Sequence, residues 1–122
     1  MKDFRNLHVW DKAHALTLEI YRLTDRFPKR EMFGVTSQMR RASASIAANI
    51  AEACGRLGKG DFSRFLSNAM RSASEVEYFL VLSRDLKLLP PEAYLQCNRD
   101  VVEVKRMLAA LITKVEMERR SN

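Results

Sequence analysis

Apolar residues recur at steps of three and four in four stretches of the chain, the spacing of one face of an α-helix. The stretches cover about residues 7–27, 35–57, 61–87 and 91 to the tail. They are separated by residues that disfavour the continuation of a helix: Pro28, the glycines within residues 55–60, and Pro90 with Pro91. The pattern predicts an all-α protein, an antiparallel up-down four-helix bundle formed by a single domain over residues 1–122. Helices this long exclude a compact three-helix DNA-binding domain.

The second stretch carries two different faces. Met39, Ile46 and Ile50 belong to its apolar stripe, which is typical of a helix that packs into a core. The opposite face holds small side chains with one Arg and one Glu: Ser37, Arg41, Ala44, Ala48, Ala51 and Glu52. Small side chains allow a neighbouring backbone to approach closely and lose little entropy on burial. We expect another helix to cover this face, either within the chain, if this helix is the central one, or from a second subunit.

Capping residues predict where the helices begin and end. Gly55 is expected to terminate the second helix, Asp61 to be the N-cap of the third, and Pro91 to lie in the first turn of the fourth. The fourth helix then has a heptad of apolar positions at Tyr94, Cys97, Val101, Val104, Leu108, Leu111 and Val115. Residues 118–122 are expected to fray.

The charge of the chain is unevenly distributed. Its formal net charge is +6, and residues 1–60 hold 11 Lys and Arg against 6 Asp and Glu. Two groups of cations are expected at opposite ends of the bundle. The first is Arg22, Arg26, Lys29, Arg30, Arg40 and Arg41, and the second is Arg56 and Lys59 with Arg64, Arg119 and Arg120. Such surfaces either bind the phosphates of RNA or DNA or are ordinary solvated surfaces.

Motifs for catalysis or metal binding are absent from the sequence. No Glu-x-x-His pair suggests a di-iron site, and residues 55–60 lack the spacing and the Ser or Thr of a phosphate-binding loop. Cys97 lies on the heptad seam, Cys54 flanks the seam of the second helix, and neither has a nearby His in the sequence. We therefore expect no catalytic residue, no metal and no cofactor.

The sequence also bears on where the protein resides. The first ten residues are polar and charged, unlike a signal peptide, and no apolar run approaches the roughly 20 residues that a membrane span needs. Two distant cysteines do not form the framework of a secreted disulfide-rich domain. The expectation is a cytoplasmic protein without a membrane partner.

Several motifs resemble those of a known family. They are Leu7-x-Val9-Trp10, Phe27-Pro28, Glu31-x-Phe33-Gly34, Gln38-x-Arg40-Arg41-Ala42, Ser45-Ile46-x-x-Asn49-Ile50-Ala51-Glu52 with Gly55-Arg56, and Phe62-x-x-Phe65-Leu66 with Glu75. The chain resembles the four-helix-bundle proteins encoded in intervening sequences of large-subunit rRNA genes. That family is similar to the accessory variability-determinant proteins of diversity-generating retroelements. The departures are Ala53 and Arg71, where the family often has Gly, and Asn68, where it has an apolar residue.

The resemblance carries expectations that the spacing of residues does not supply. It implies an up-down four-helix bundle that assembles into a homopentamer. The retroelement branch binds nucleic acid and a reverse transcriptase through a basic surface, without catalysis, whereas the intervening-sequence branch has no assigned role. The resemblance therefore also implies RNA or DNA, and a reverse transcriptase or other protein, as candidate partners. Two functions stay open at this point: a nucleic-acid-binding accessory protein, and a protein-interaction scaffold that binds no nucleic acid. Glu52 and Arg56, four residues apart, are expected to form a helical ion pair.

Overall fold

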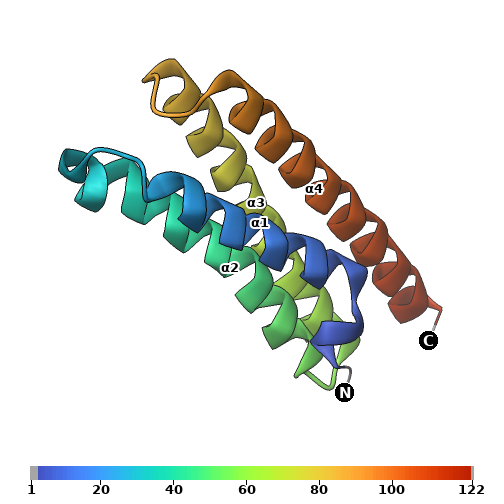
Figure 1. The fold of residues 1–122 in the computed structure, drawn as a ribbon. Helices are drawn as coiled ribbons and strands as arrows, with labels where there is room; N and C mark the ends of the chain where they lie inside the picture. The colour runs from blue at the N-terminus through green and yellow to red at the C-terminus, as the bar shows by residue number, and fades with distance from the viewer. Residues whose placement is uncertain (1–2, 122) are drawn as a thin grey trace.

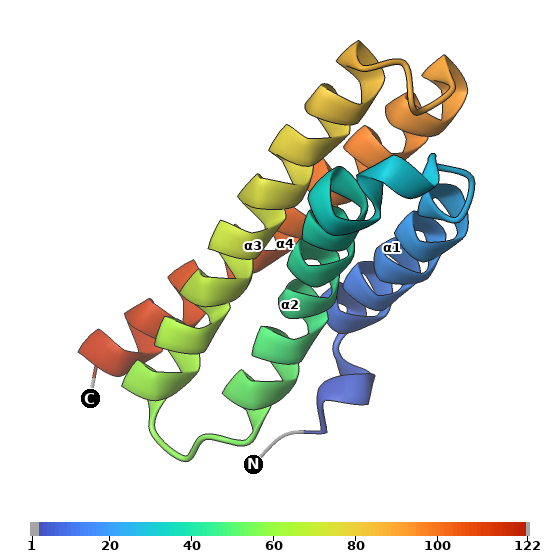
Figure 2. The ribbon, with the colours of Figure 1, turned by 90° about the vertical axis from the view of Figure 1, so that its left-hand side faces the viewer.

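The structure, a computed structural model, describes residues 3–121 and contains four long helices. They are α1 (His8–Thr24), α2 (Ser37–Cys54), α3 (Lys59–Asp85) and α4 (Pro91–Arg120). Each helix runs antiparallel to the one before it, and contacts link α1 to α2, α2 to α3, α3 to α4 and α4 back to α1 (Figures 1 and 2). Residues 3–121 contain no strand, so the predicted all-α four-helix bundle is confirmed.

The core is built from the predicted stripes. Its largest fully buried side chains come from all four helices and include Leu16, Ile20, Met39, Ile46, Ile50, Leu66, Leu80, Val101, Val104 and Leu108. The heptad of α4 faces this core, with Cys97, Val101, Val104, Leu108 and Val115 buried. Burial of such side chains is the main favourable contribution to folding, at about 1.5–3 kcal/mol for each large aliphatic group.

Small polar side chains lie inside the contacts that α2 makes with α1 and α3. Ser72 of α3 donates a hydrogen bond to Ser45 of α2 (Oγ to Oγ, 2.8 Å). Thr17 of α1 donates to the backbone carbonyl of Ser43 at 3.0 Å. The fully buried Ser83 hydroxyl lies 3.1 Å from the sulfur of Met39. Because these hydroxyls are small and bonded, the helices approach closely without leaving these polar groups unsatisfied.

Two predicted helix ends are confirmed. Gly55 is the C-cap of α2, where its N–H donates to the carbonyls of Ala51 and Glu52, and Pro91 is the first residue of α4. Gly55 nevertheless keeps a right-handed backbone (φ −82°), so it ends the helix without the left-handed turn typical of glycine.

Two other predictions about helix ends are wrong. The N-cap of α3 is Gly58 rather than Asp61, because the extended backbone of Gly58 already starts the helix and its carbonyl accepts from the N–H of Phe62. Asp61 lies in the first turn of α3, where its negative charge interacts favourably with the positive end of the helix dipole. Residues 118–120 are helical rather than frayed, since the helical backbone hydrogen bonds continue to the N–H of Ser121, which donates to the carbonyl of Met117. Residue 122 lies outside the described range.

Candidate nucleic-acid interface

The first group of predicted cations surrounds the connection between α1 and α2. We call residues 25–36, which join these helices, the hairpin tip (Figure 1). A short 3-10 turn over Lys29–Glu31 and a π-helical turn over Met32–Thr36 fold the tip compactly after Pro28. Arg26, Lys29 and Arg30 are exposed, and within the described part of the chain they make no ion pair. Their charges therefore remain available to an external anion.

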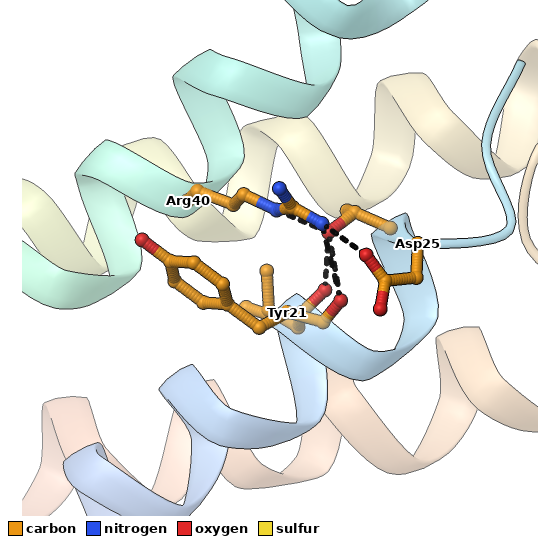
Figure 3. A network of polar contacts seen from close by, with 5 residues as sticks. Tyr21, Asp25 and Arg40 are labelled. Carbon is orange, nitrogen blue, oxygen red and sulfur yellow. Dashed lines mark hydrogen bonds and ion pairs between the residues drawn. The ribbon is translucent and has the colours of Figure 1, made fainter. Parts of the chain in front are cut away.

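Arg40 has a different environment from the tip cations (Figure 3). Its guanidinium donates to the hydroxyl of Thr24 at 2.8 Å, to the carboxylate of Asp25 at 2.9 Å and to the carbonyl of Tyr21 at 3.4 Å. It also lies 4.8 Å from the centre of the Tyr21 ring, and its side chain is only 21% exposed. Arg40 therefore ties the end of α1 to the start of α2 through charge-assisted hydrogen bonds, one of them to a carbonyl in the last turn of α1.

We expect Arg40→Ala to lower the free energy of unfolding by about 1.5–3 kcal/mol, the usual value of hydrogen bonds to a charged group. Arg26→Ala is the matched control, because Arg26 is exposed, lies outside the small face of α2 and has a side chain that makes no hydrogen bond or ion pair among residues 3–121. That variant should stay within about 0.5 kcal/mol of the parent. Urea unfolding followed by circular dichroism measures both, and equal effects of the two variants would contradict the assigned role of Arg40.

Arg22 is engaged on its own helix. It forms an ion pair with Glu19, and this hydrogen-bonded guanidinium lowers the pKa of the Glu19 carboxyl. Arg41 lies beyond the tip, on the outward side of α2. Of the six cations predicted at this end, the structure thus brings Arg26, Lys29 and Arg30 together at the tip and gives Arg40 and Arg22 partners within the chain.

The second predicted group lies at the opposite end of the bundle. The predicted pair of Arg56 with Glu52 is confirmed at 3.0 Å. The guanidinium groups of Arg56 and Arg64 both lie over the Phe65 ring, 4.6 and 4.5 Å from its centre, and Arg64 also pairs with Asp61. Lys59 is exposed. Most cations at this end therefore have an aromatic or acidic partner, which leaves less free charge than at the hairpin tip.

A small cavity opens beside this second group. Its volume is about 180 Å³, and it lies between the α2–α3 connection and the end of α4. Its lining is Cys54, Arg56, Leu57, Gly58, Lys59, Phe62, Val115 and Glu118. The lining therefore combines apolar side chains with charges of both signs.

The predicted small face of α2 lies on the outside of the bundle. Ala48, Arg41 and Glu52 are exposed, while Ser37, Ala44 and Ala51 are partly buried. The helices of the chain itself therefore leave this face open, and α2 is not a central helix surrounded on all sides. Arg41 and Glu52 do not pair with each other within the chain.

Both cysteines are buried, and they form no disulfide. Burial raises the pKa of the Cys97 thiol to about 11, so this group stays protonated at neutral pH and is a poor nucleophile. Among residues 3–121 no three His, Cys, Asp or Glu side chains form a cluster suited to a metal ion. Within the same residues no helix has the length and apolar character needed to cross a membrane.

One surface residue was not selected as a candidate binding residue from the sequence. Phe33, at the hairpin tip, is 97% exposed, and its neighbour Met32 is 43% exposed. The sequence contained a signal for it: Phe33 lies between the periodic stripes of α1 and α2, directly before Gly34. Gly34 has non-helical backbone angles (φ −116°, ψ −115°) and interrupts the turn at this point.

Comparisons with known proteins agree with the fold. The model of the 23S rRNA-intervening sequence protein family matches residues 5–110. A crystal structure of a protein of unknown function from the S23 ribosomal protein family of Bacteroides thetaiotaomicron is similar, with a TM-score of 0.80 and 30% identity. That match covers 86% of this chain and 95% of the other. A search of curated proteins found no match. Since the family model spans most of the sequence, the chain belongs to the 23S rRNA-intervening sequence protein family.

Proposed function

We propose that this protein is a non-enzymatic accessory protein that binds RNA or DNA through a basic surface and acts as a homo-oligomer. The observation that carries the proposal is the exposed, unpaired charge of Arg26, Lys29 and Arg30 at the hairpin tip. Residues 22–41 contain six Lys or Arg against only Asp25 and Glu31.

Electrostatic binding explains why such a surface needs no catalytic group. Each cation that neutralises a phosphate releases condensed counterions, and this release favours binding most strongly at low salt. The cations at the tip lie in the connection between α1 and α2, and the Arg40 contacts hold the adjoining ends of these two helices together. No motif for reading base edges accompanies them, so the binding is expected to depend little on sequence.

The open small face of α2 supports the proposed oligomer. A helix buries one stripe in its own bundle, and the exposed Ala48 between partly buried Ala44 and Ala51 forms a second, closely approachable surface. A second copy covering this face would repeat the hairpin tip on each subunit and multiply the positive charge. The resemblance to the rRNA-encoded and retroelement proteins supports five subunits, and the expected setting is the cytoplasm.

A salt titration of binding to a mixed-sequence RNA or DNA oligonucleotide tests the proposal. We compare the parent with Lys29→Glu/Arg30→Glu and with Lys12→Glu/Lys114→Glu, which removes the same charge at exposed, unpaired positions near the other end of the bundle. The tip variant should bind about tenfold or more weakly at low salt and lower the slope of log K against log salt by about 1.4–1.8. The control variant should change the affinity and the slope much less.

Two outcomes would count against this function. No binding by the parent even at low salt would overturn it and favour the second candidate, a protein-interaction scaffold. Equal losses in the two variants would show that the tip is not the binding surface. Co-purification with nuclease treatment addresses the scaffold directly, because a protein partner such as a reverse transcriptase would remain bound after the nucleic acid is destroyed.

A further inference from the structure

The hairpin tip combines a fully exposed aromatic ring with free cations. Phe33 is 97% exposed, more than any other large apolar side chain in residues 3–121. Lys29 and Arg30 occupy the 3-10 turn just before it and are exposed. A phenylalanine ring in water loses the favourable burial that aromatic side chains normally contribute. Its position among cations therefore points to a ligand that carries both a flat apolar surface and negative charge.

The backbone of the tip keeps Phe33 away from the core. The turn is interrupted at Gly34, where the backbone leaves the helical region. The next residue, Val35, packs against the core, and Thr36 is buried. Phe33 thus projects from a segment that is anchored on its C-terminal side. An aromatic side chain has only two rotatable angles, so a ring on an anchored segment loses little entropy when a ligand stacks on it.

The acidic groups near the tip leave its positive charge largely intact. Asp25 is paired with Arg40 at 2.9 Å. Glu31 is the remaining carboxylate, and its Oε1 lies 3.4 Å from the position that a Cβ on Gly34 would take. Arg26, Lys29 and Arg30 therefore outnumber the single unpaired acid. This balance suits a phosphate chain better than an acidic peptide, because nucleotides supply a base to stack and a phosphate at each step.

We infer that Phe33 is a stacking platform for one base of a single-stranded nucleic acid, with Lys29 and Arg30 contacting adjacent phosphates. The inference rests on the proposed function and deepens it by naming the strand state of the ligand. Bases in a duplex are already stacked on their neighbours and their faces are inaccessible, whereas an unpaired base offers its face to the ring. The ring has no hydrogen-bonding group, so the contact accepts any base.

The experiment compares Phe33→Ala with the parent on a fluorescent single-stranded oligo(U) and on a duplex of the same charge. Loss of one base–aromatic stack is expected to weaken single-strand binding by about 5- to 150-fold. Duplex binding should be nearly unchanged. The slope of log K against log salt should also stay the same, because no charge is removed. Phe33→Trp should retain the single-strand affinity of the parent.

Leu57→Ala is the matched control, since Leu57 is also an exposed apolar residue (91%) but lies at the opposite end of the bundle. It should leave binding unchanged. Equal affinity of Phe33→Ala and the parent for oligo(U) would overturn the inference while leaving the proposed function intact. A parent that binds neither probe would overturn both. A lower oligomer mass for Phe33→Ala in light scattering would overturn the inference by showing that a second copy of the chain covers the ring.

Discussion

Ala48→Arg is expected to convert the proposed oligomer into single subunits. Ala48 is exposed on the outward face of α2, between the partly buried Ala44 and Ala51. A long charged side chain at this position would hold a neighbouring helix away and place an unpaired charge in the contact. Light scattering at micromolar protein concentration measures the change, and the expected result is a drop to the mass of one subunit.

The fold of this variant should survive. Arginine has a high helix propensity, and the core stripe of α2 at Met39, Ile46 and Ile50 does not include Ala48. Circular dichroism should therefore show almost unchanged helix content. Ala110→Arg, at an exposed position of α4, is the matched control and should keep the oligomer. A parent protein that already has the mass of one subunit would refute the oligomer, and loss of all helical signal in Ala48→Arg would place Ala48 in the core.

Leu66→Ala is expected to lower the free energy of unfolding by about 2–5 kcal/mol. Leu66 of α3 is 0% exposed, so the shorter side chain leaves a cavity that the surrounding side chains fill only in part. A loss of this size is a large fraction of the roughly 5–15 kcal/mol that stabilises an ordinary domain. In urea unfolding the midpoint should fall while the slope stays the same, since the surface exposed on unfolding is almost constant.

Leu18→Ala is the control for this prediction. It is the same change from Leu to Ala, but the Leu18 side chain on α1 is 58% exposed. Its effect should be within about 0.5 kcal/mol. Both variants are measured at one protein concentration, because assembly adds to apparent stability by mass action. Similar losses in the two variants would contradict the assignment of Leu66 to the core.

The sequence predicted the four helices and their buried faces with good accuracy. Ile46 and Ile50 of α2 are four residues apart, and Val101 and Val104 of α4 belong to a heptad of apolar positions. All four side chains are buried, as this spacing predicts. The pair of Glu52 with Arg56 was also predictable, because a spacing of four residues places both side chains on one side of a helix.

The candidate site was predicted less completely. The sequence grouped Arg40 with the tip cations, but only the packing of α1 against α2 brings Tyr21, Thr24 and Asp25 to its guanidinium. The neighbouring Arg41 points to the open face of the same helix and makes no such contact. A rotation of about 100° per residue separates the two side chains, and the position of a helix distant in sequence decides which of them is engaged.

The end of the third helix is another feature that the sequence did not predict. The third helix ends in a turn where Lys87 adopts a left-handed backbone (φ 62°), and the N–H of Leu88 donates to the carbonyl of Ser83. Glycine is the residue that normally signals such a turn, so this turn could not be predicted from the residues present. The exposure of Phe33 was not predicted either: its place directly before Gly34 indicated a break in the helix, but an aromatic residue near a helix is usually buried.

The number of helices, their buried stripes and the excess of cations in the first half of the chain could all be predicted from the order of residues alone. These features depend on residue spacing and on helix propensity, which are local properties. Helix packing, in contrast, sets which cations are paired, leaves the small face of α2 outside the bundle and leaves Phe33 exposed at the hairpin tip. Such properties depend on which helices pack side by side, and contacts between distant segments are not encoded in any single stretch of sequence.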